Sequence, residues 1–175
     1  MAEKKRPTAR PSADAVVSAG RAVVRLSRRL EVALAEVDLT LSQYRVLVFL
    51  ANGESRPSRI APNVNVTRPS VTALVDGLVA RGLVDRQPDE TDRRRVRHRV
   101  TPAGNRALLE ADRAVEANLR SLSAHLDPAG AAGAVESLAL WHRAIDTAIA
   151  TAETSARRDT ELAAAATAAR REAAR

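Results

Sequence analysis

The chain contains no cysteine, which excludes disulfides, thiolate metal sites and redox sensing through thiols. Aromatic residues make up only 2% of its 175 residues. Proteins that bind single-stranded RNA usually stack bases on aromatic side chains, so this scarcity argues against an RNA-binding or ribosome-associated function. The only methionine is Met1, so methionine oxidation has no packed side chain to disrupt.

Long apolar runs are also missing. No segment approaches the roughly 20 apolar residues that a membrane-spanning helix needs, and residues 1–12 lack the apolar middle of a signal peptide. We therefore expect a cytoplasmic protein on or near the nucleoid.

The three histidines, His98, His125 and His142, fall on separate predicted elements without a paired carboxylate or nucleophile. This pattern predicts no enzyme activity, no cofactor and no metal site.

What the chain has in abundance is arginine. The net charge is +7 and the isoelectric point is about 11.1, yet Lys4 and Lys5 are the only lysines. The planar guanidinium group donates two parallel hydrogen bonds, which suits phosphate and guanine. A basic balance alone is weak evidence for the partner, because ribosomal, membrane-surface and nucleoid proteins share it.

Apolar periodicity and cap residues divide the chain into five segments and predict a mainly α fold with one small β-hairpin. The long flanking helices carry apolar faces that the central unit is too small to cover, so we expect a two-fold homodimer. The predicted segments are a disordered basic arm (1–11), an N-terminal dimerisation helix (12–38), a winged helix-turn-helix domain (39–100), C-terminal dimerisation helices (101–150) and an Ala/Arg-rich helical or disordered tail (151–175).

The central segment shows the signature of a helix-turn-helix. Thr40 and Gln43 form a capping box for a helix that ends near Ala51. A short helix is predicted over Ser58–Val64, and a recognition helix over Arg68–Arg81, ended by Gly82. The predicted DNA contacts of the recognition helix are small or polar, so that the helix can approach base edges: Thr67, Arg68, Pro69, Ser70, Thr72 and Ala73. The alternative is a capped surface helix without a ligand.

A hairpin rich in arginine follows the recognition helix. Its strands are predicted over Leu83–Arg86 and Val96–Val100, separated by the turn-rich segment Gln87–Asp92. Clustered cations repel one another unless solvent or a polyanion relieves them. The predicted DNA contacts of this wing are Asp92, Arg93, Arg94, Arg95 and Arg97. The alternative is a basic loop that contacts only solvent.

The order of motifs from about Leu39 to Leu109 resembles the MarR family of winged helix-turn-helix regulators. The matching stretches are Leu39–Leu47, Val66–Thr72, Leu78–Arg86, Asp92–Arg94 and Val100–Gly104. The resemblance implies a homodimer on a pseudo-palindromic operator, with the family's Asp-x-Arg wing motif at Asp92 and Arg94. Pro62 and Ala73 depart from the usual family pattern.

The resemblance also implies that a small aromatic or anionic effector could enter a cleft between the dimer helices and the winged unit, and that its binding could release the DNA. The predicted cleft residues are the cations Arg25, Arg28 and Arg45 and the rings of Tyr44 and Phe49, each of which could instead be structural or solvated. We expect a transcription regulator, with a repressor favoured over an activator. The alternative is an architectural nucleoid-associated protein that binds DNA without responding to a ligand.

Overall fold

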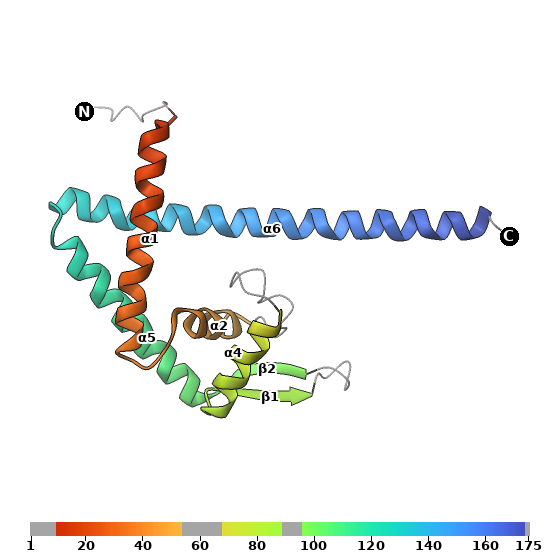
Figure 1. The fold of residues 1–175 in the computed structure, drawn as a ribbon, viewed down its shortest axis with the longest axis horizontal. Coiled ribbons are helices and arrows are strands. Elements are labelled where there is room, and N and C mark those ends of the chain that lie inside the picture. The colour runs from red at the N-terminus through yellow and green to blue at the C-terminus, as the bar shows by residue number, and fades with distance from the viewer. Residues whose placement is uncertain (1–9, 54–67, 89–95, 174–175) are drawn as a thin grey trace, which may run out of the picture. The chain divides into compact units, whose positions relative to one another are not determined.

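A computed structural model describes residues 10–53, 68–88 and 96–173 of the chain (Figure 1). Contacts divide it into two compact units, one reaching to Arg120 and the other starting at Ser121. The elements are α1 (Ala13–Ala35), α2 (Leu41–Ala51), α4 (Arg68–Ala80), β1 (Val84–Pro88), β2 (Val96–Val100), α5 (Pro102–Ser123) and α6 (Pro128–Ala173). The predicted fold class, mainly α with one antiparallel hairpin, is confirmed.

Local cap chemistry places the helix starts where the sequence predicts them. The Ser12 hydroxyl accepts a hydrogen bond from the Ala15 amide at 3.2 Å and caps α1. At α2 the Thr40 hydroxyl accepts from the Gln43 amide at 3.1 Å, and the Gln43 side chain accepts from the Thr40 amide at 3.0 Å. This capping box satisfies two amides that the first helical turn leaves without a partner.

The core of the first unit lies where the end of α1, α2, α4, the base of the hairpin and α5 meet. On α4, Val71, Val75 and Leu78 follow each other at helical spacing and are buried against Leu34 of α1 and Val46 and Leu47 of α2. Burial of this apolar stripe fixes which face of α4 points outward.

The two strands pair antiparallel, with Val84 opposite Val100 and Pro88 opposite Val96. β1 begins one residue later than predicted because the Leu83 amide is bonded to the Leu78 carbonyl and closes the end of α4. It also extends two residues further, to Pro88. The proline lacks an amide hydrogen, so it is tolerated at the end of a strand rather than in the middle.

The two C-terminal helices belong to different units over most of their length. α5 begins after Thr101, and its buried residues are Gly104 and Ala111. α6 continues through Ala150 to Ala173 without a break. Within the residues described, none of the helices combines the length and the apolar character that a membrane span would require.

Candidate nucleic-acid interface

The outward face of α4 is formed by small and polar residues. Thr72, Ala73 and Asp76 are exposed on the side opposite the buried stripe, as predicted for a helix that must approach another surface closely. The backbone of Arg68, Pro69 and Ser70 forms the first turn of α4. The predicted DNA contact Thr67 and the predicted helix over residues 58–64 lie outside the described residues.

The hairpin presents arginine side chains next to α4. Arg97 and Arg99 are exposed on β2 and lie two residues apart, on the same face of the strand. His98 and Val100 on the opposite face are half-buried, whereas Val96 remains 50% exposed at the end of the hairpin. The predicted wing residues Asp92, Arg93, Arg94 and Arg95 lie outside the described residues. The described part of the wing is therefore a cationic strand with one packed face.

An ion pair connects the outward face of α4 to the hairpin. The Arg86 guanidinium on β1 donates to the Asp76 carboxylate on α4, and both side chains are about half exposed. Asp76 and Arg86 lie on different elements, so the sequence alone does not indicate that they pair. The pair adds a polar contact between the wing and α4.

The connection between β2 and α5 holds the base of the wing. The Thr101 amide donates to the Leu83 carbonyl at 3.0 Å, and the Thr101 hydroxyl donates to the Gly82 carbonyl at 2.7 Å. The same hydroxyl accepts from the Gly104 amide at 3.0 Å and caps α5. A single threonine thus joins the end of α4, the hairpin and the start of α5.

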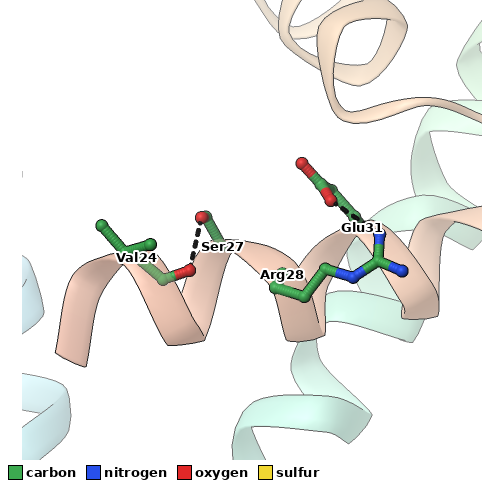
Figure 2. A network of polar contacts seen from close by, with 4 residues as sticks. All are labelled: Val24, Ser27, Arg28 and Glu31. Atoms are coloured by element: carbon green, nitrogen blue, oxygen red, sulfur yellow. Dashed lines mark hydrogen bonds and ion pairs between the residues drawn. The ribbon is translucent and has the colours of Figure 1, made fainter. Parts of the chain in front are cut away.

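The predicted effector residues are spread over several environments. On α1, Arg28 donates to Glu31 at 3.1 Å, and the Ser27 hydroxyl donates to the Val24 carbonyl at 2.9 Å, as Figure 2 shows. Arg25 lines a shallow depression of about 570 Å³ on the exposed face of α1. Arg45 is exposed on α2, and Phe49 packs against the core.

Tyr44, the fifth predicted effector residue, has a partner within the protein. Its hydroxyl donates to the Asp112 carboxylate on α5 at 2.7 Å. Burial raises the pKa of the Tyr44 phenol, and the hydrogen bond to Asp112 and the negative charge of that carboxylate raise it further. The phenol therefore stays protonated and binds α2 to α5.

Each unit leaves apolar side chains exposed on its long helix. In the first unit, Val17 and Val24 on α1 are 52% and 69% exposed and line the depression beside Arg21 and Arg25. In the second unit, Trp141 and Ile145 on α6 are 64% and 54% exposed. Both long helices therefore carry apolar side chains on their exposed faces.

A recognition-type helix, a paired hairpin and a helix that returns to the core together define a winged-helix protein. Residues 37–95 match the model described as MarR family. An uncharacterized HTH-type transcriptional regulator of Mycobacterium leprae is 36% identical over 94 residues, which are 53% of this chain and 66% of that protein. This stretch of the chain is therefore similar to MarR family regulators, and the matched part spans just under two thirds of the length of that relative.

Solved structures share the fold. RV1404 from Mycobacterium tuberculosis superposes with a TM-score of 0.63 at 26% identity, covering 79% of this chain and 98% of that one. The transcriptional repressor CouR, solved bound to a 23-mer DNA duplex, gives a TM-score of 0.60 at 28% identity and covers 71% of this chain and 89% of that one. The structure of CouR from Rhodococcus jostii RHA1 bound to p-coumaroyl-CoA gives a TM-score of 0.56 at 24% identity. The superposition covers 68% of this chain and 85% of that one.

Proposed function

We propose that this protein is a DNA-binding transcription regulator that acts as a homodimer on a pseudo-palindromic operator. The observation that carries the proposal is the joint presentation of α4 and the hairpin. Thr72 and Ala73 are exposed on α4, which the Asp76–Arg86 pair joins to β1. The paired strand β2 exposes Arg97 and Arg99. The match of residues 37–95 to the MarR family model, and the DNA complex of CouR, support the same use of this surface.

In this proposal, α4 reads bases and the wing contacts the phosphate backbone. The major groove admits a helix whose exposed residues are small, and Arg68, Ser70 and Thr72 supply polar groups for base edges. Arg94 and Arg97 in the wing neutralise phosphates, with Asp92 orienting the neighbouring guanidinium groups. Thr67, Pro69, Ala73, Arg93 and Arg95 complete the proposed contact surface.

We assign the exposed apolar faces of α1 and α6 to contacts between two copies of the chain. The flanking helices expose valine, tryptophan and isoleucine side chains. Burial of such apolar surface contributes a favourable free energy of about 25 cal/mol for each Å² and so drives association. A two-fold dimer presents two copies of α4 to successive turns of one duplex, which requires a symmetric site.

Repression of one or a few promoters is the regulatory mode we favour. CouR, whose fold this chain shares, is a transcriptional repressor. A small aromatic or anionic effector that releases the DNA is part of the proposal, and its candidate residues are Arg25 and Arg28 on α1 and Tyr44, Arg45 and Phe49 on α2.

The proposal is tested by recovering tightly bound duplexes from a random library with the purified full-length chain, then measuring the affinity of wing and helix variants. Arg97→Ala should weaken binding to the recovered duplex and to random DNA by the same factor. It should also lower the slope of log affinity against log salt concentration by about one, as expected for the loss of one phosphate contact. Thr72→Ala should instead change the preference between sequences. Arg113→Ala, an exposed arginine on α5, provides a control with the same change in net charge.

Two outcomes would overturn the assignment. If Arg97→Ala and Arg113→Ala had equal effects, the hairpin would not be the phosphate-binding element. If no duplex were preferred over competitor DNA, the protein would be an architectural DNA-binding protein rather than a regulator of particular promoters.

A further inference from the structure

The helices α1 and α4 end in the same backbone motif. At the end of α1, the Leu39 amide donates to the Leu34 carbonyl at 3.0 Å and the Asp38 amide donates to the Ala35 carbonyl at 3.1 Å. At the end of α4, the Leu83 amide donates to the Leu78 carbonyl at 2.9 Å, and the Gly82 amide donates to the Val79 carbonyl at the same distance. Both sets of hydrogen bonds define a Schellman motif.

The residue that reverses the chain differs between the two motifs. Gly82 adopts φ +68°, where glycine has no steric penalty. Asp38 occupies the equivalent position in α1 with φ +58°, and among the described residues it is the only one other than glycine with a positive φ. Aspartate is one of the few residues besides glycine that adopt this conformation, and unlike glycine it brings a side chain that can make a contact.

The Asp38 side chain reaches the end of the other helix. Its carboxylate accepts a hydrogen bond from the Arg81 guanidinium at 2.8 Å, and Arg81 directly precedes Gly82. The carboxylate is 93% exposed and the Arg81 side chain 34% exposed. An exposed pair of this kind contributes little to folding, but it is directional, whereas the apolar contacts under α4 are not.

We propose that Asp38 is a positioning residue that fixes the direction of α4 through Arg81 and so sets the affinity for the operator. The inference rests on the proposed role of α4 in reading DNA. α4 has 13 residues and is about 20 Å long, so a tilt of about 5° at its Arg81 end displaces its first turn by about 2 Å. Base contacts tolerate only about 0.5 Å of such displacement.

The sign of the effect separates this role from simple electrostatics. Asp38→Asn removes a negative charge from a DNA-binding protein, which by itself should strengthen binding. Loss of a positioning contact should weaken it, by about two- to fivefold for each protomer and by the square of that factor for a dimer. Asp38→Gly should do the same while leaving the urea midpoint of unfolding unchanged or raised, because glycine relieves the positive φ.

The experiment measures the affinity of Asp38→Asn, Asp38→Gly, Arg81→Gln and the double variant Asp38→Asn/Arg81→Gln for the duplex recovered from the random library. Glu36→Gln removes an exposed carboxylate from the same turn and serves as the charge control. We expect Asp38→Asn to bind more weakly than wild type and Glu36→Gln to bind at least as tightly. Arg81→Gln should have a smaller effect in the Asp38→Asn background than in wild type, because the two residues act through one contact.

The inference is overturned if Asp38→Asn binds as tightly as Glu36→Gln, or if affinity and the unfolding midpoint fall together in Asp38→Gly. Failure of the proposed function looks different, since the wild-type chain would then show no preference for any duplex.

Discussion

The sharpest structural prediction concerns Gly104, which is buried in the first turn of α5. A Cβ atom at this position would overlap the Leu83 carbonyl oxygen and come within 2.7 Å of Val100 Cγ1. The Leu83 carbonyl is backbone and already accepts the Thr101 amide at 3.0 Å, so it cannot move without breaking that bond. Gly104→Ala must therefore separate α5 from the base of the wing.

The size of the effect follows from three terms. Overpacking of this kind costs about 1–3 kcal/mol, and loss of the Thr101 hydrogen bond adds about 1 kcal/mol. Replacing glycine by alanine inside a helix returns about 1 kcal/mol. The net loss of unfolding free energy is about 2 kcal/mol, which corresponds to a fall in Tm of about 4–8 °C for a chain of this length.

The assay is thermal and urea unfolding followed by far-ultraviolet circular dichroism at one fixed protein concentration, because association changes the apparent stability. Gly77→Ala provides the matched control, since a Cβ at that helical glycine meets no atom within 4 Å. Gly77→Ala should be stabilised by up to about 1 kcal/mol. If Gly104→Ala were as stable as Gly77→Ala, the close contact between α5 and the wing would be refuted.

Three further predictions follow from individual contacts. Asp76→Asn and Arg86→Gln should each weaken DNA binding in a fluorescence anisotropy titration while lowering stability by less than about 1 kcal/mol, and Asp85→Asn on the exposed strand β1 should not weaken binding. Because the folded state raises the pKa of Tyr44 above its ordinary value of 10.0, the folded state holds its proton more tightly than the unfolded state. Stability should therefore fall as the pH rises above 10.0, and Tyr44→Phe should remove that part of the fall; an identical alkaline profile for the variant would contradict the assignment. Trp141, the single tryptophan, is 64% exposed on α6, so a dimer that buries it should show blue-shifted fluorescence that moves to the red on dilution, whereas red emission at every concentration would exclude Trp141 from the interface.

Features set by local sequence were predicted well. Ser12, Thr40 and Gly82 act on backbone groups within a few residues of themselves, so the helix ends could be read without knowing the fold. The hairpin was also predicted, and its strand limits shifted because the Leu83 amide closes α4. That hydrogen bond depends on how α4 ends rather than on strand propensity.

Contacts between distant elements could not be predicted in the same way. The pairs Asp38–Arg81, Tyr44–Asp112 and Asp76–Arg86 join residues on different elements, and exposed charges offer many alternative partners until the elements pack. The MarR resemblance indicated the general location of a binding cleft, but of the predicted effector residues the structure places only Arg25 along a described depression. The effector site stays a prediction for that reason.

The most direct test of the central claim is the symmetry of the duplexes that the full-length chain selects from a random library. A dimer that places two copies of α4 in successive major grooves predicts an enriched inverted repeat, with half-sites about 10 base pairs apart from centre to centre. Enrichment of a single asymmetric half-site, or a recovered pool no different from the starting library, would contradict the account.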